Sequence, residues 1–142
     1  MNKQLRMNKT VSINAPVSKV WEALVTPAWI KQYMFGTDAI SDWKVGSSMV
    51  FAGTWEGKEY KDKGTILKFE KEKVFQYSYW SGFSGLPDVP ENYSIVTFEL
   101  SSHGGQTTLS LTQNNFPDEQ SMEHTGKNWE GVLQTMKGLI EK

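Results

Sequence analysis

The sequence predicts an α+β domain in which a curved antiparallel sheet of six strands grips one long C-terminal helix. Two observations carry this prediction. Apolar and polar residues alternate over most of the region from residue 49 to residue 111, which is typical of strands. Apolar residues then recur at helical spacing from Lys127 to Lys142. The 142 residues fit a single domain, 1–142.

The N-terminal part is predicted to form one strand followed by two short helices. Residues 6–14 alternate in part, with Val11 and Ile13 on one face. Pro16 and Pro27 then stand where a helix can begin, because proline is favoured in the first helical turn. Apolar side chains follow each proline at helical spacing, so residues 17–24 and 29–34 are expected to be amphipathic helices.

Five further strands are predicted after Gly36. They lie around residues 49–55, 60–69, 74–80, 96–100 and 109–111. Turn residues such as Glu56-Gly57-Lys58 and Gly104-Gly105 keep their connections short, which favours antiparallel neighbours. The segment Ser81 to Asn92 holds two glycines and two prolines and is expected to be the longest loop. The predicted order is β-α-α-β-β-β-β-β-α.

The composition excludes several classes of function. The chain has no cysteine, so it can form neither a thiolate nucleophile nor a cysteine metal site. A net charge of −1 and a single arginine, Arg6, argue against nucleic-acid recognition. No apolar run is long enough for a membrane span, so a cytoplasmic protein is expected. Two histidines, His103 and His124, form neither a dyad nor a metal site. We therefore expect no catalytic residue, no metal and no cofactor.

Several segments together resemble one family. They are Asn14–Leu24 with Thr26-Pro27, Trp43–Met49, Gly64–Leu67, Lys73–Trp80, Val96–Leu100, Thr107–Leu111 with Phe116-Pro117, and the closing His124, Gly126 and Asn128–Leu133. In this order they are similar to activator of heat-shock-protein-90 ATPase homologue-like domains (AHSA-type) of the START/Bet-v-like SRPBCC superfamily. Ser47 and Asn128 depart from this pattern, since the family often has glycine at both positions.

The resemblance covers about Thr10 to Glu141. It implies the helix-grip fold, with a hydrophobic cavity between the sheet and the last helix. Members of the superfamily bind lipids, polyketides, sterols or hormones, some are cyclases, and one branch stimulates a chaperone ATPase. The resemblance thus implies a hydrophobic ligand or a chaperone partner, and with the latter a role in the stress response.

The aromatic residues are the candidate ligand-binding site. Rings and flexible apolar side chains would supply shape and exclude water, and tyrosine hydroxyls would orient the ligand. The predicted site consists of Tyr33, Phe35, Tyr77, Tyr79, Phe98, Leu111, Trp129, Val132 and Met136. The alternative interpretation is that these residues only fill the core.

Three functions are compatible with the sequence. The first is non-enzymatic binding of a small apolar or aromatic molecule in this cavity. The second is docking of a chaperone or another protein through a lysine-rich face that includes Lys61, Lys63 and Lys68. The third is a cyclase-type or hydrolase-type enzyme that uses the pocket tyrosines or His124.

Overall fold

The computed structural model describes residues 1–142 as one antiparallel seven-stranded sheet with three α-helices. The strands are β1 (Asn2–Ile13), β2 (Asp38–Ser41), β3 (Ser48–Trp55), β4 (Lys58–Glu70), β5 (Val74–Tyr79), β6 (Ser94–His103) and β7 (Gln106–Phe116). The helices are α1 (Val17–Val25), α2 (Pro27–Tyr33), the single 3₁₀ turn η1 (Pro90–Asn92) and α3 (Glu119–Ile140). None of the helices combines the length and the apolar character that crossing a membrane requires.

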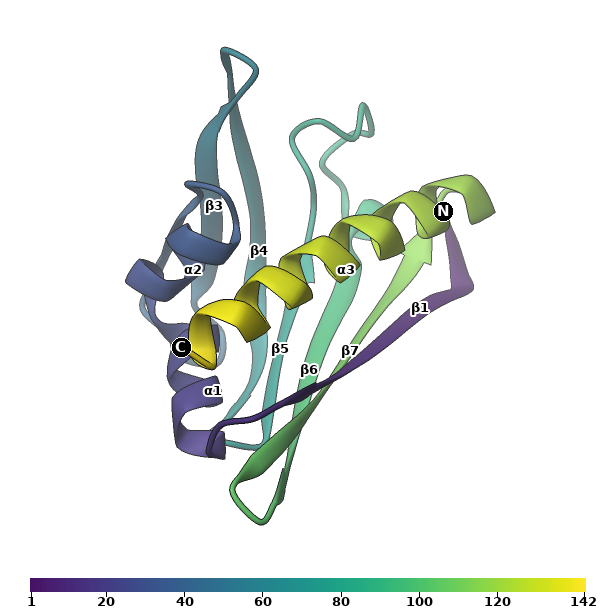
Figure 1. The fold of residues 1–142 in the computed structure, drawn as a ribbon. Coiled ribbons are helices and arrows are strands. Elements are labelled where there is room, and N and C mark those ends of the chain that lie inside the picture. Colours follow the sequence, from purple (N-terminus) through teal and green to yellow (C-terminus); the bar gives the residue numbers. More distant parts are fainter.

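The strands follow one another in the sheet except for β1, which pairs with β7, so the sheet order is β1-β7-β6-β5-β4-β3-β2. α1 and α2 connect the two edge strands and lie together at one end of the sheet (Figure 1). α3 crosses one face of the sheet diagonally, with its C-terminal end beside α1 and α2 (Figure 1). We call the face under α3 the inner face and the opposite one the outer face. The α+β class and the helix-grip arrangement are thus confirmed.

The predicted number of strands is wrong, because the sheet has seven strands and not six. The additional strand is β2, an edge strand of four residues that pairs with β3. So short a strand shows almost no alternation in sequence: Ala39 is buried and Ile40 is 59% exposed. The observed order is therefore β-α-α-β-β-β-β-β-β-α.

α3 begins earlier than the helical spacing indicates. Asp118 caps its first turn, because its Oδ1 accepts a hydrogen bond of 2.8 Å from the backbone N–H of Ser121. Gly126 lies inside the helix and is buried against β1, where an added Cβ would come within 3.4 Å of Met7 Cγ. The small residue lets the helix axis approach the sheet closely, so Gly126 marks a close contact between α3 and β1.

Gly64 marks an irregularity that curves β4. A Cβ added there would lie 1.6 Å from the backbone oxygen of Ser78, so only glycine fits between β4 and β5. Nearby, the pairing of β4 with β5 shifts register between Ile66 and Lys68. Bulges of this kind bend a strand and increase its twist. The bend carries the β3–β4 hairpin away from the rest of the sheet (Figure 1).

Candidate ligand-binding site

One row of inward side chains crosses the centre of the inner face. Tyr77 of β5 lies opposite Val96 of β6, and Val96 lies opposite Gln113 of β7. All three are buried, with exposed fractions of 2%, 0% and 5%. From α3, the indole Nε1–H of Trp129 donates to Oε1 of Gln113 at 2.9 Å. The helix and the sheet therefore meet at this row, with Val96 as the floor between two polar side chains.

Aromatic rings close the space next to this row. Phe98 stacks on Phe75 with ring centroids 6.2 Å apart, and Trp129 meets Phe98 edge to face at 5.7 Å. Leu111 lies opposite Phe98 in the sheet and is fully buried. Offset and edge-to-face contacts of this kind add to the stabilisation from apolar burial. This side of the site is a packed wall.

The hydroxyl of Tyr77 has no hydrogen-bond partner in the protein, in contrast to the hydroxyls around it. Tyr33 donates to the backbone oxygen of Ala23 at 2.9 Å, and Tyr79 donates to Asp62. The one side-chain polar atom that is both unpaired and sealed from solvent is Oδ1 of Asn115. The unpaired Tyr77 hydroxyl, though 98% of its residue is covered, is therefore reached by solvent.

The side-chain amide of Gln113 is in the same situation. Its oxygen accepts from Trp129, while its NH₂ group has no partner and is likewise not sealed. Buried polar groups in folded proteins are nearly always paired, and exceptions call for an explanation. Two such groups in one row of the inner face indicate a place where a bound molecule can complete the hydrogen bonding.

A buried carboxylate lies beside this row. Asp62 of β4 is 9% exposed and accepts hydrogen bonds from the Tyr79 hydroxyl at 2.6 Å and from the Gly82 backbone N–H at 2.8 Å. Burial raises the pKa of Tyr77 and Tyr79, and the negative charge of Asp62 raises both pKa values further. Burial likewise raises the pKa of Tyr33, to which Tyr77 contributes. The three phenols therefore stay protonated over the whole physiological range.

Exposed aromatic rings stand at the β3–β4 hairpin beyond Asp62. Trp55 is 59% and Phe83 is 51% exposed, and their ring centroids lie 6.3 Å apart. Phe83 also contacts Tyr60 at 5.7 Å, and the Tyr60 hydroxyl is hydrogen bonded to Thr37. Gly53 leaves room for Tyr60, since a Cβ there would lie 2.6 Å from its hydroxyl. We call Trp55, Tyr60 and Phe83 the aromatic rim.

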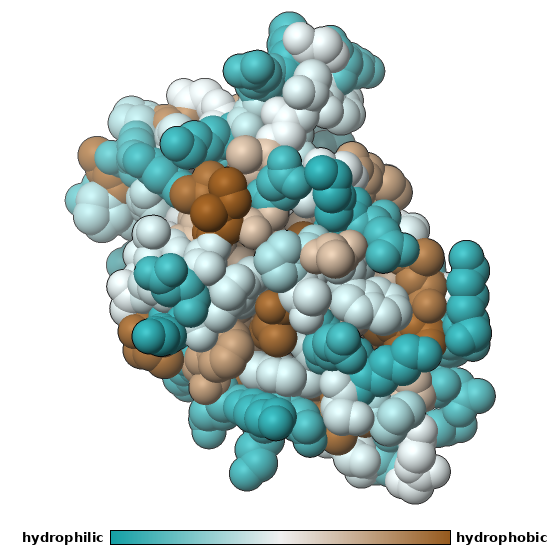
Figure 2. Space-filling model, turned by 90° about the vertical axis from the view of Figure 1, so that its left-hand side faces the viewer, coloured by the Kyte–Doolittle hydropathy of each residue, from teal (hydrophilic) through white to brown (hydrophobic).

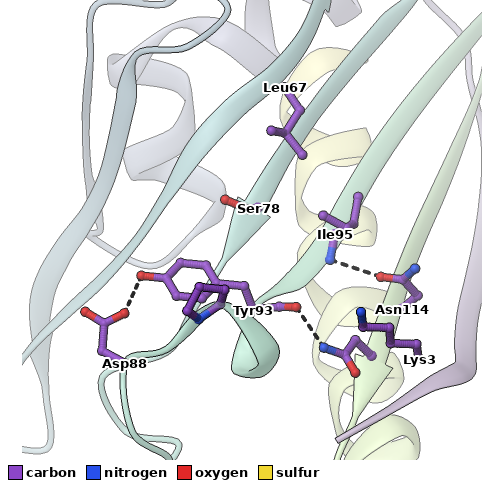
Figure 3. Close-up of a pocket in the computed structure, with 9 residues that line it drawn as sticks. Lys3, Leu67, Ser78, Asp88, Tyr93, Ile95 and Asn114 are labelled. Atoms are coloured by element: carbon purple, nitrogen blue, oxygen red, sulfur yellow. Dashed lines mark hydrogen bonds between the residues drawn. The ribbon is translucent and has the colours of Figure 1, made fainter.

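Two hollows lie on the outer face, on the side of the sheet away from α3. The larger has a volume of about 590 Å³ and is lined by residues that include Leu67, Tyr93 and Ile95 (Figure 3). The smaller, about 330 Å³, shares Ile95 with it. Figure 3 shows the labelled side chains of the larger hollow in front of the sheet with the helix behind it, so this hollow is separate from the inner site.

The rim of the larger hollow is held by a chain of polar contacts. The Tyr93 hydroxyl donates to Oδ1 of Asp88 at 2.5 Å, and Asp88 also pairs with Lys63 (Figure 3). The Lys63 contact, followed by the Tyr93 bond, lowers the pKa of Asp88. Burial, followed by this bond, raises the pKa of Tyr93 to about 12. These groups satisfy one another on the surface, so they offer a ligand less than the unpaired groups of the inner face do.

The comparison with protein families decides the identity of the fold. The family model of the activator of Hsp90 ATPase homolog 1-like proteins (AHSA1) matches residues 14–141. The chain belongs to this family. No match was found among curated proteins.

Solved structures agree with the assignment of this AHSA1-like domain. The solution structure of ChR145 from Cytophaga hutchinsonii is 46% identical over 99% of this chain and 97% of its own, with a TM-score of 0.85. CalU16 from Micromonospora echinospora is 24% identical over 95% of this chain and 73% of its own, with a TM-score of 0.77. The Aha1 dimer from Colwellia psychrerythraea is 20% identical over 97% of both chains, also with a TM-score of 0.77. The last two show the fold alone.

The AHSA1-like domain gathers only part of the predicted site. Tyr77, Tyr79, Phe98, Leu111 and Trp129 lie together on the inner face, joined by strand pairing and ring contacts. Whether they contact a ligand stays a prediction.

The other predicted residues have different surroundings. Met136 is fully buried in the core and Val132 is half-buried on α3. The hydroxyl of Tyr33 ties α2 to α1. Phe35 follows the end of α2 in a left-handed conformation, φ 55°, and is 72% exposed, apart from the buried group.

Several residues of the inner site were missed in the sequence. Asp62 lies in a charge-dense stretch that is most simply interpreted as a solvated strand, yet it shares the inner face with Tyr60 and Ile66. Gln113 continues the alternation of Leu109 and Leu111, which was the signal that could have placed it inside.

The lysine-rich face lies on the outer side of the sheet. Lys61 and Lys63 flank the inward Asp62, so they point outward. Lys63 is engaged by Asp88 and lies 5.7 Å from the centre of the Trp80 ring, while Lys68 lines the smaller hollow.

Around α2 and β2, hydrophobic side chains are scattered among hydrophilic ones (Figure 2). This side of the domain therefore carries no continuous apolar patch.

Proposed function

We propose that this AHSA1-like domain binds a small, mostly apolar molecule on the inner face, between Tyr77, Val96, Gln113 and Trp129. The observation that carries the proposal is the Tyr77 hydroxyl, which is solvent-reached and unpaired within an otherwise closed aromatic interior. A cytoplasmic location and the binding of a hydrophobic compound, both expected from the sequence, belong to the same proposal.

The energetics favour a bound molecule that completes this row. A polar group in a protein interior that has no protein partner costs up to about 1–3 kcal/mol, and less where water reaches it. A phenylalanine at position 77 would avoid that cost while keeping the ring contacts with Phe51 and Phe75. A ligand that accepts from or donates to the hydroxyl recovers the lost hydrogen bond. The flanking rings provide the apolar contact area that binding pockets for small molecules commonly have.

Each residue then has a distinct role. Val96 and Phe98 form the apolar floor, and Trp129 covers it from α3. The Tyr77 hydroxyl and the Gln113 amide orient the polar end of the ligand. The aromatic rim, half exposed, lies where a ligand would enter from the hairpin end.

Titration of a fluorescent aromatic ligand against the protein tests the proposal directly. We suggest titration of 2-naphthylmethanol, a neutral two-ring alcohol, against the wild type and the Tyr77→Phe variant. Loss of one hydrogen bond should weaken binding about two- to tenfold. The Tyr93→Phe variant, which removes an outer-face hydroxyl, is the matched control and should bind like the wild type. Equal weakening by both variants, or no binding to the wild type, would contradict the proposal.

Docking of a protein partner is a second candidate function, and the aromatic rim favours it. Trp55 and Phe83 expose more than half of their surface next to one another, and exposed aromatic residues are frequent anchors of protein interfaces. The family name points to a chaperone of the Hsp90 class.

A pull-down with a purified chaperone of this class separates the two candidates. The variants Trp55→Ser and Phe83→Ser should lose the partner if the rim is the docking site. Ile40→Ser, which removes an exposed side chain of the edge strand β2, is the control. Retention of the partner by both rim variants would exclude this docking site.

A further inference from the structure

Asp62 is a buried carboxylate without a cationic partner. Its two hydrogen bonds come from neutral donors, the Tyr79 hydroxyl and the Gly82 N–H. The four ion pairs of the protein lie elsewhere and join Lys9 to Glu130, Lys31 to Asp38, Lys63 to Asp88 and Lys137 to Glu141. The negative charge of Asp62 is therefore uncompensated at the inner face.

The other polar groups that face this region are neutral. The row beside Asp62 offers the Tyr77 hydroxyl and the Gln113 amide, and Tyr60 of the aromatic rim is paired with Thr37. Lys9 of β1 lies opposite the inward Leu111 in the sheet, and its ammonium group forms an ion pair with Glu130. A bound anion would thus find no free positive charge here.

The consequence for a ligand follows from electrostatics in a region of low polarity. Charges interact more strongly where water is excluded than they do in bulk solvent. A carboxylate ligand next to Tyr77 would be repelled by Asp62, whereas an ammonium group or a neutral donor would be attracted. Like-charge juxtaposition is a common device by which proteins reject unwanted ligands.

We infer that Asp62 determines the class of ligand at the inner site: it selects neutral or cationic molecules that carry a hydrogen-bond donor, and it excludes carboxylates. This inference rests on the proposed function, because it concerns the same site. Asp62 acts here as a specificity-determining residue, held by the Tyr79 hydroxyl next to the ring of Tyr77.

Three probes of one shape test the inference: 2-naphthylmethanol, 2-naphthylmethylammonium and 2-naphthoate, each titrated against the wild type at neutral pH. The wild type should prefer the ammonium over the carboxylate by about tenfold or more, as expected for a poorly screened charge. This comparison needs no variant. A preference for the carboxylate, or equal affinity for both charged probes, would overturn the inference even if the alcohol binds.

The Asp62→Asn variant then assigns the selectivity to this residue. Asparagine keeps the shape of the side chain: its Oδ1 can accept from the Gly82 N–H, and its NH₂ group can donate to the hydroxyl oxygen of Tyr79. The ammonium should bind about tenfold more weakly, the carboxylate more tightly, and the alcohol within about twofold of the wild type. Glu59→Gln, an exposed charge removal on the same strand, is the control and should change none of the three.

Two outcomes separate the role of Asp62 from ligand binding at the inner face. If the wild type binds the alcohol but Asp62→Asn keeps the wild-type ratio of ammonium to carboxylate, the inference about Asp62 is wrong and the binding site stands. If the wild type binds none of the three probes, the proposed function is wrong and the inference falls with it.

Discussion

The hydroxyl of Tyr79 donates to the carboxylate of Asp62 at 2.6 Å, which links β5 to the curved part of β4 on the inner face. The carboxylate also receives the Gly82 N–H, so one buried side chain holds two strands and the start of the β5–β6 loop. Hydrogen bonds to charged acceptors are stronger than neutral ones. This contact therefore fixes the geometry of the site at its charged side.

Removing this donor should destabilise the protein. In Tyr79→Phe the buried carboxylate keeps only the Gly82 N–H, and the expected loss is about 1–3 kcal/mol in the free energy of unfolding. Urea denaturation followed by tryptophan fluorescence measures it. Tyr93→Phe, which removes a hydroxyl bonded to the surface residue Asp88, should cost less than about 1 kcal/mol. Similar losses in the two variants would contradict a special role for the Tyr79–Asp62 contact.

The Tyr77→Phe variant should behave in the opposite way. The hydroxyl it removes has no partner, so the free energy of unfolding should stay within about 0.5 kcal/mol of the wild type or rise slightly. Combined with weaker binding of 2-naphthylmethanol, this separates a ligand-binding residue from a core residue. A loss of more than about 1 kcal/mol would show that the hydroxyl is satisfied inside the folded protein.

Stability should fall at alkaline pH because of the buried phenols. The pKa values of Tyr33, Tyr77 and Tyr79 are raised above the ordinary value of 10.0. Above that pH the unfolded chain releases phenol protons that the folded chain retains, so the unfolded state binds fewer protons and the unfolding free energy decreases. Below it, this contribution is fully present.

Urea denaturation at a series of alkaline pH values measures how steeply the unfolding free energy falls with pH. Each buried tyrosine should contribute up to about 1.4 kcal/mol per pH unit once its unfolded form is ionised. Tyr77→Phe should show a shallower decline than the wild type, because one of the three groups is removed. An unfolding free energy that stays constant to about pH 11 would contradict the burial of these phenols.

Gly64→Ala should be the most damaging small substitution. The new methyl group would overlap the backbone oxygen of Ser78, with only 1.6 Å between them, so β4 and β5 must separate. We expect a loss of about 3 kcal/mol or more, measured by thermal denaturation. Gly138→Ala on the exposed side of α3, where nothing lies within 4 Å, should instead stabilise by about 0.5–1 kcal/mol. If Gly64→Ala and Gly138→Ala changed the stability equally, the close approach of β4 and β5 would not be the reason for glycine at position 64.

The sequence was informative where a periodic pattern was long. The alternation through Phe75, Tyr77 and Tyr79 and the helical spacing of Trp129, Leu133 and Met136 placed these residues on the correct faces. The four residues of β2 were missed because so short an edge strand carries little periodic signal.

The candidate site was less predictable than the fold. Aromatic residues could be proposed from their type, but pairing across strands decides which of them meet. Phe35 shows the limit, because its ring is on the surface although α2 is where it was expected. Asp62 shows the converse, since only its place among the inward-facing positions of β4 distinguishes it from the outward-facing lysines on either side. Such distinctions depend on register, which long-range contacts set.

The most direct test of the binding site is an NMR titration of the ¹⁵N-labelled protein with 2-naphthylmethanol. The Trp129 indole N–H, the Gln113 side-chain NH₂ and the Val96 amide should shift together and saturate, while Ser78 and Asn114 at the outer hollows stay unchanged. Shifts confined to Ser78, Ile95 and Asn114, or no saturable shift at all, would contradict binding at the inner face.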